Sequence, residues 1–403
     1  MYQAFKYRIY PTSAQQLALA KSFGCCRWFW NYSLNLCHET YRNTGKSLSR
    51  GAIQKMLPQL KKEYEWLKTD TYSQCLQVVA LNLSNAYKNF FEKQAILPRF
   101  KSKNGKQSIS FPQNVKFDGD YLKLPKIGLI YCRCHRNFEG TIKTVIVSKN
   151  PDGKYFASVV IDDNQEHPEI STDGKAVGID LGLNHFCITS DGSKYNNPKH
   201  IAKHVKNLKR KQQQLARKQK GSHTRNKARI KVAKVQGKIA RCREDFLHKL
   251  SRKIVNENQV IAVENIHVKG MVRNHNLAAS ISDSSWGILS TMLSYKANRV
   301  GKVYIEVERF FPSSKTCHVC LNQVESLPLD MSRWTCEHCQ STHDRDINTA
   351  INIKNEALRI LSLGTSDTAT LRECKSSGKT SVLLDAVPVE VGSPYHSGSF
   401  GVG

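Results

Sequence analysis

The chain has 403 residues, of which 61 are lysine or arginine and 33 are aspartate or glutamate, so its formal net charge is +28. A hydrophobic fraction of 40% can form real cores and excludes a globally disordered chain. The sequence contains no uninterrupted apolar run of about 18 residues, so it predicts no membrane-spanning helix. The opening MYQAFKYRIYPTS lacks the apolar region of a secretory signal. We therefore expect a cytoplasmic protein of two or three domains without membrane contact.

The positive charge predicts a polyanionic partner, because like charges repel one another in a compact chain and binding to a polyanion releases counterions. Nucleic acid is the first candidate, and an anionic membrane surface is the second. A basic surface that only confers solubility is the remaining interpretation.

The first hundred residues predict one strand followed by a helical block. Residues 4–10 alternate between apolar and basic side chains, which is typical of a half-buried strand. Pro11 ends the strand, and Ser13 and Gln16 have the spacing of a helix capping box. Helical periodicity then continues to about residue 95.

From Pro98 the pattern changes to a basic loop followed by short strands, which is typical of a small β-barrel. We expect strand 4–10 to join this barrel, so that the helical block is an insertion. The predicted strands are Ser108–Phe111, Tyr121–Leu124, Lys143–Val147 and Tyr155–Ile161. The polar, turn-rich stretch 162–174 is the predicted domain boundary.

The second half of the chain predicts an α/β domain. Its expected strands are Ala176–Gly182, His185–Ser190, a short strand after Asp191-Gly192, Gln259–Asn265 and Lys302–Val307, with an amphipathic helix at Ser285–Val300. Beyond Leu363 the sequence is rich in Ser, Gly and Thr without periodicity, and we expect a mobile tail.

Residues 203–243 contain 16 lysines and arginines among 41 positions and no acidic residue. Helical spacing on both sides of Gly221-Ser222 predicts two basic helices in a hairpin. A solvated charged face is the alternative, but like charges one turn apart repel without carboxylates to compensate them. The expected nucleic-acid contacts are Lys206, Lys209, Arg210, Lys211, Arg217, Lys218, Arg225, Lys227, Arg229 and Lys231, together with Arg99 and Lys101 in the basic loop.

Two cysteine pairs have the spacing of a structural zinc site. Cys317 and Cys320 are two residues apart, as are Cys336 and Cys339, and fifteen residues separate the pairs. Each pair can present both sulfurs to one metal, and four thiolates complete a tetrahedral site with no open position. His318 and His338 lie within the pairs and are alternative ligands; four unliganded cysteines are the other interpretation.

Three carboxylates occupy unusual positions. Asp180 interrupts the apolar strand Ala176–Gly182, Glu264 closes the strand VIAVEN, and Asp346 begins the last predicted helix. A carboxylate in a buried strand needs a partner, and an ion pair is the structural interpretation of each residue alone. Together they can meet at one edge of an α/β sheet and bind Mg²⁺ or Mn²⁺, which prefer oxygen ligands. Gly178 and Gly182 are expected to leave room for a substrate backbone near Asp180.

The chain resembles the TnpB (OrfB) proteins of bacterial and archaeal insertion sequences, which are related to type V CRISPR effector nucleases. The matching segments extend over nearly the whole chain to about residue 360. They are GIDLG at 178–182, VENI at 263–266, PSSKTC at 312–317 with the cysteine pairs, HDRDIN at 343–348, PRFK at 98–101 and REDFLHK at 243–249.

The resemblance implies a transposon-encoded, RNA-guided DNA endonuclease of the prokaryotic cytoplasm, with a RuvC-like (RNase H-type) nuclease core. Asp180, Glu264 and Asp346 would be its catalytic residues and its Mg²⁺ or Mn²⁺ ligands, and Asp346 is preferred to Asp344. The partners would be guide RNA and target DNA, with one protein on its RNA as the working expectation.

The resemblance also implies a domain plan. Residues 1–10 plus 98–165 would form a wedge-like barrel, and 11–97 a helical, HTH-like recognition lobe. The nuclease core would comprise 173–310, with the basic hairpin at 199–250, and 343–362, with the structural zinc ribbon at 311–342 inserted. The tail would be 363–403.

Two other functions remain open at the level of sequence. A transposase acting without guide RNA would join strands with the same carboxylates, whereas a regulator would only bind nucleic acid. Two positions depart from the family pattern: Leu321 stands where glycine is usual, which predicts a strained or altered first cysteine turn, and Thr349 replaces alanine.

Overall fold

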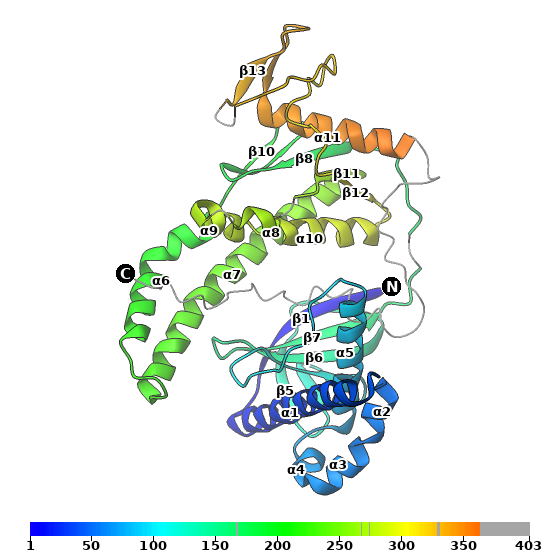
Figure 1. Cartoon of the computed structure of the whole chain (residues 1–403), viewed down its shortest axis with the longest axis vertical. Coiled ribbons are helices and arrows are strands. Elements are labelled where there is room, and N and C mark those ends of the chain that lie inside the picture. The colour runs from blue at the N-terminus through cyan, green and yellow to red at the C-terminus, as the bar shows by residue number, and fades with distance from the viewer. Residues whose placement is uncertain (167, 267, 274, 329–330, 363–403) are drawn as a thin grey trace. The chain divides into compact units, whose positions relative to one another are not determined.

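The computed structural model describes residues 1–166, 168–266, 268–273, 275–328 and 331–362 (Figure 1). These residues form two compact units, the first comprising Met1–Glu166 and the second the described residues that follow. The tail predicted at 363–403 lies outside the described residues. None of the helices in the described part of the chain has the length and apolarity needed to traverse a bilayer.

The first unit is built on a seven-stranded antiparallel sheet in the order β2-β6-β7-β1-β5-β4-β3. Its strands are β1 (Tyr2–Tyr10), β2 (Gln107–Phe111), β3 (Lys116–Asp118), β4 (Tyr121–Leu124), β5 (Gly128–Arg133), β6 (Thr141–Lys149) and β7 (Tyr155–Asp162). The first strand of the chain therefore lies in the middle of a sheet whose other strands come a hundred residues later. Its apolar side chains Tyr7 and Ile9 are buried in a core shared with the helices.

The helices of this unit lie between β1 and β2 in the chain. They are α1 (Ser13–Thr44), α2 (Arg50–Lys55), α3 (Leu57–Glu63), α4 (Glu65–Thr69) and α5 (Ser73–Phe91). The capping box at the start of α1 is one residue earlier than predicted, because Thr12 is the extended cap residue and Ser13 is already helical. Thr12 accepts from the backbone of Gln15, whose side chain in turn accepts from the backbone N–H of Thr12.

The second unit is built on a five-stranded mixed sheet in the order β10-β9-β8-β11-β12. The prediction of a mixed α/β chain is therefore confirmed. The strands are β8 (Ala176–Leu181), β9 (His185–Thr189), β10 (Lys194–Asn196), β11 (Val260–Glu264) and β12 (Val303–Val307). The helices are α6 (His200–Ala216), α7 (His223–Glu257), α8 (Val268–Met271), α9 (His275–Ser284), α10 (Trp286–Arg299) and α11 (Arg345–Ser362).

Helices cover both faces of this second sheet (Figure 1). Side chains on one face, such as Ile179 and Val263, pack in a core with α7 and α10. On the other face, Ala262 packs with Ile353 of α11. Between β12 and α11 the chain forms a small subdomain with the two-stranded sheet β13 (Arg333–Thr335) and β14 (Thr342–Asp344).

Candidate functional site

Asp180 and Glu264 lie at the same edge of the second sheet because their strands are parallel neighbours. Ile179 of β8 is in register with Val263 of β11, so the next residue on each strand is one of the two carboxylates. Side chains alternate along a strand, and Asp180 therefore shares the face of Gly178, just as Glu264 shares the face of Ala262. Both carboxylates are thus on the α11 face at the carboxyl end of their strands.

Helix α11 brings the third carboxylate to this edge. A Cβ on Gly178 would lie 2.0 Å from the carbonyl oxygen of Ala350, so the helix backbone rests directly on β8. Asp180 lies two residues beyond Gly178, and Asp346 lies one helical turn before Ala350. Gly178 therefore makes room for α11 and not, as predicted, for a substrate. A Cβ on Gly182 would be 3.0 Å from the His185 carbonyl, so this glycine too faces the protein's own backbone.

The electrostatics of the edge centre on Asp180. Burial, followed by the negative charges of Asp346 and Glu264, raises the pKa of Asp180 from 3.8 to about 7. Burial also raises the pKa of Glu264. The negative charges of Asp346 and Glu264 thus reach Asp180, and a bound cation would favour the ionised form of the Asp180 carboxyl.

The three carboxylates are nevertheless not a tight cluster. Among the described residues, the four cysteines are the only group of three or more His, Cys, Asp or Glu side chains whose ligand atoms all lie within 4.8 Å of one another. Asp180 nevertheless lies near enough to both other carboxylates for their charges to raise its pKa.

Asp344, the alternative to Asp346, has a different place. Its Oδ1 accepts from the backbone N–H groups of Asp346 and Ile347, at 3.2 and 3.3 Å, as the N-cap of α11. Its other carboxylate oxygen forms a 2.7 Å ion pair with Lys194. Asp344 therefore starts the helix that carries Asp346.

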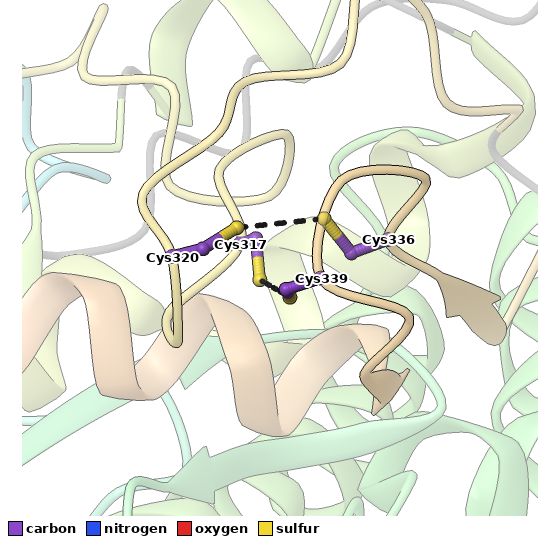
Figure 2. Close-up of side chains that lie close together, drawn as sticks. All are labelled: Cys317, Cys320, Cys336 and Cys339. Atoms are coloured by element: carbon purple, nitrogen blue, oxygen red, sulfur yellow. Dashed lines mark hydrogen bonds between the residues drawn. The ribbon is translucent and has the colours of Figure 1, made fainter.

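The four cysteine sulfurs converge between two matching turns (Figure 2). The Sγ atoms of Cys317 and Cys339 are 3.6 Å apart, and so are those of Cys320 and Cys336. Zinc–sulfur bonds of about 2.3 Å in a tetrahedron require sulfur separations of about 3.8 Å. The donor set and its spacing thus fit a zinc ion. Hydrogen bonding with the side chain and backbone of Ser341 lowers the pKa of Cys339 to about 6.

The leucine that replaces the usual glycine leaves the first turn with the same geometry as the second. Leu321 has φ 63° and donates to the Cys317 carbonyl at 2.9 Å, while Gln340 has φ 59° and donates to the Cys336 carbonyl at 2.9 Å. Both residues adopt the left-handed conformation, at a cost of about 1–2 kcal/mol each for a non-glycine residue. Leu321 therefore strains the backbone of the first cysteine turn, but this turn keeps the same shape as the second.

The histidines near the cysteines act outside the sulfur cluster. Nδ1 of His318 lies 2.9 Å from Oδ1 of Asn348, which only accepts, so this nitrogen carries a proton. Nε2 of His343, a residue to which the sequence assigned no role, lies 3.1 Å from Sγ of Cys317. Such neighbours orient metal ligands.

The basic segment forms an antiparallel pair of helices, α6 and α7, with Ser222 as the N-cap of α7. Of the predicted contact residues, Arg225 is partly buried and donates to the carbonyls of Leu215 and Lys218, so it closes the hairpin. Lys211 is also partly buried. The others are exposed, namely Lys206, Lys209, Arg210, Arg217, Lys218, Lys227, Arg229 and Lys231, and so are Arg99 and Lys101.

In the first unit, the loop with Arg99 and Lys101 is fastened to α1. Trp30 donates to the Arg99 carbonyl at 3.0 Å, and Asn31 exchanges two hydrogen bonds with the backbone of Lys101. The Lys101 ammonium lies 3.7 Å from the centre of the Trp30 ring. Fixing the backbone in this way lowers the entropic cost of presenting basic side chains to a partner.

Comparisons with known proteins match three segments of the chain to family models. Residues 158–275 match the OrfB_IS605 family, described as "Probable transposase", residues 286–353 match the "Cas12f1-like, TNB domain", and residues 1–46 match a "Helix-turn-helix domain". A Streptomyces pristinaespiralis protein named "Putative RNA-guided DNA endonuclease" is 35% identical, over 97% of this chain and 98% of its own length. The chain belongs to the TnpB (OrfB) family.

A second relative and one solved structure extend the comparison of this TnpB-family chain. "Putative RNA-guided DNA endonuclease InsQ" of Escherichia coli K12 is 30% identical over 90% of this chain and 94% of its own length. The Cas12f1 chain in a solved sgRNA–target DNA complex superposes with a TM-score of 0.57 over 88% of this chain and 99% of its own, at 13% identity. This last match establishes a shared fold.

Proposed function

We propose that this TnpB-family protein is an RNA-guided DNA endonuclease that hydrolyses phosphodiester bonds at Asp180, Glu264 and Asp346. The observation that carries the proposal is the convergence of these carboxylates on one face and one edge of the second sheet, where Asp346 and Glu264 help to raise the pKa of Asp180. The names of the two full-length relatives support the reaction and the guide.

The three carboxylates fit Mg²⁺ or Mn²⁺, because they are oxygen donors without a competing His or Cys among them. Two such ions about 3.5–4 Å apart would activate water and stabilise the leaving oxygen of a phosphodiester. Asp180, whose pKa is raised by both other carboxylates, would hold such an ion together with Asp346 and Glu264. Asp344 keeps α11 in place and is assigned no direct contact.

The four cysteines would hold zinc in a structural role, because all four coordination positions are thiolates and none is left for substrate. The core of the ribbon consists of Trp334, Cys317 and Cys336, with a few partly buried apolar neighbours. So small a core does not fold without its metal.

Guide RNA and target DNA are the proposed partners. The net charge of +28 supports polyanion binding, and the exposed lysines and arginines of α6 and α7 offer a basic surface without carboxylates along residues 203–243. In such a system base pairing with the guide selects the target, while the protein contacts the backbone and the shape of the heteroduplex.

The test is cleavage by the full-length protein purified with its co-purifying RNA. Matched DNA should be cut only with Mg²⁺ or Mn²⁺, and Asp180→Asn should abolish cutting while RNA binding stays unchanged. Glu356→Gln is the matched control, because Glu356 lies on the same helix as Asp346 and pairs with Arg359. Joining of DNA strands in the absence of RNA would instead indicate a transposase. Full cutting by Asp180→Asn would contradict a mechanism that depends on the Asp180 carboxylate.

A further inference from the structure

Two buried asparagines of α11 hold the first cysteine turn. Asn348 and Asn352 are one helical turn apart and only 1% and 3% exposed. Oδ1 of Asn348 accepts from the backbone N–H of His318 at 3.0 Å and from its ring Nδ1 at 2.9 Å. Nδ2 of Asn348 donates to the Thr316 carbonyl at 2.8 Å. The side chain thus spans the residues on either side of Cys317.

Asn352 adds two bonds to the same segment. Its Nδ2 donates to the carbonyls of Ser313 and Thr316, at 2.8 and 2.6 Å. His343, on the strand that leads into α11, brings Nε2 within 3.1 Å of the Cys317 sulfur. The turn that presents Cys317 is therefore bonded to two side chains of α11 and contacts one of β14, and all three are buried.

The same helix carries Asp346 in its first turn, two residues before Asn348. On its other side α11 packs against β8, where the Ala350 carbonyl lies against Gly178. The start of α11 is thus held between the strand of Asp180 and the turn of Cys317. If the cysteine turn moves, the contact between α11 and this turn changes, while the contact between α11 and β8 stays in place.

We propose that Asn348 and Asn352 are positioning residues that couple metal occupancy of the four-cysteine site to the placement of Asp346. The proposal deepens the proposed function and rests on it for the role of Asp346. With the metal in place, the cysteine turn offers fixed carbonyl and N–H partners to the two amides. Without the metal the turn loses its cross-link, and the two buried amides lose their fixed partners, which is unfavourable for buried polar groups. The first turn of α11 then shifts to satisfy these groups elsewhere.

A structural role alone would stabilise the ribbon without affecting the carboxylates. The two interpretations differ in what Asn348→Ala does when zinc is still bound. The four thiolates are intact in this variant, so zinc content should stay at one ion per chain. Coupling predicts that the first turn of α11 nevertheless becomes mobile.

Hydrogen–deuterium exchange of the full-length protein tests this directly, because it needs no cleavage. In the wild type, a zinc chelator should increase exchange of the amides at 345–350. In Asn348→Ala, exchange there should already be high with zinc bound and should respond little to the chelator. Asn352→Ala should behave in the same way and decides the question if Asn348→Ala does not fold. Asn355→Ala, an exposed asparagine on the same helix, should match the wild type.

Cleavage provides the second measurement. The Mg²⁺ concentration for half-maximal rate should rise about tenfold in both variants, as for other residues that orient metal ligands, with much of the rate recovered at saturating Mg²⁺. Unchanged exchange at 345–350 in zinc-loaded Asn348→Ala would overturn the coupling, as would loss of zinc in step with loss of activity. If the wild type shows no Mg²⁺-dependent cleavage, the proposed function fails, while the exchange experiment still decides the coupling.

Discussion

Gly178 shows how one missing side chain positions the candidate site. A Cβ at this position would meet the Ala350 carbonyl oxygen at 2.0 Å and the Lys354 nitrogen at 2.6 Å. Both atoms belong to the helix backbone, which cannot yield as a flexible side chain can. The glycine is therefore the condition for α11 to lie on β8 and for Asp346 to reach the edge where Asp180 lies.

Gly178→Ala should consequently lower the free energy of unfolding by at least about 2 kcal/mol, because it overpacks a helix–strand contact. DNA cleavage should fall with it, since Asp346 moves away from Asp180. Gly287→Ala is the control: Gly287 lies in α10 with no atom within 4 Å of an added Cβ. This change should raise stability by up to about 1 kcal/mol. Denaturant unfolding measures both, and equal stabilities would contradict the steric argument.

The raised pKa of Asp180 predicts a pH dependence of stability. The folded, metal-free protein binds this proton with a pKa of about 7, against 3.8 for the unperturbed group. Folding therefore loses stability as pH rises from about 4 to about 7. Asn carries no such charge, so Asp180→Asn should be more stable than the wild type at about pH 8, by on the order of 4 kcal/mol.

At about pH 4 the carboxyl is neutral in the folded state and only about half ionised in the unfolded state, so most of this advantage of Asp180→Asn should disappear. Thermal unfolding in zinc-containing buffer without Mg²⁺ measures the difference. Added Mg²⁺ should stabilise the wild type only, because the variant lacks a ligand. A stability difference that does not change with pH would show that Asp180 ionises normally.

At the scale of elements, the hairpin of α6 and α7 contains basic residues with two different structural roles. Arg225 donates to carbonyls at the end of α6, whereas Lys209 and Arg229 are exposed. Charge alone does not distinguish them in the sequence. Their hydrogen bonds do.

Lys209→Gln and Arg229→Gln should each weaken RNA binding and reduce the slope of log K against log salt by about 1, if each contacts one phosphate. Arg225→Gln should instead lower the unfolding temperature of the hairpin. Affinity titrations at several salt concentrations, with circular dichroism as the stability control, distinguish the two effects. An unchanged salt slope for both exposed positions would mean that the hairpin faces solvent in the complex.

At the scale of the whole molecule, each of the two units has a core of its own. The first unit packs its helices and seven-stranded sheet in one apolar cluster, and the second has separate clusters on the two faces of its sheet. The cysteine site belongs to the second unit, and its turn is bonded to α11.

Zinc removal should therefore lower the unfolding temperature of the second unit and leave that of the first unchanged. The loss should be several kcal/mol, because structural zinc contributes folding free energy directly. Differential scanning calorimetry with and without a zinc chelator should resolve two transitions, of which one moves. A single transition that moves as a whole would show that the two units unfold together.

Much of this organisation was predictable from the sequence, because the signals are local. The two cysteine pairs are each two residues apart, so a single turn brings their sulfurs together, and the structure places all four in one cluster. The alternation in residues 4–10 and the run Tyr121–Leu124 likewise predicted β1 and β4 from neighbouring residues alone. The assignment of Asp180, Glu264 and Asp346 as catalytic residues remains a prediction to be tested by cleavage.

Other features depend on contacts between distant parts of the chain. The strands β3 and β5 were missed, because Lys116–Asp118 is short and Gly128–Arg133 lies between turns without strong alternation. The spatial relation of Asp180 to Glu264 follows from a register between strands eighty residues apart. Asn348 and Asn352 look like ordinary polar helix residues until the cysteine turn is seen against them.

The sequence by itself therefore determined which side chains are available for chemistry: a four-thiolate metal site, three isolated carboxylates and a basic segment for a polyanion. The tertiary structure decided how they meet, with α11 against Gly178 and the amides of the same helix on the cysteine turn. The physical reason is that spacing along the chain controls geometry only over a few residues. Register, helix packing and buried hydrogen bonds are determined by partners that lie far away in the sequence.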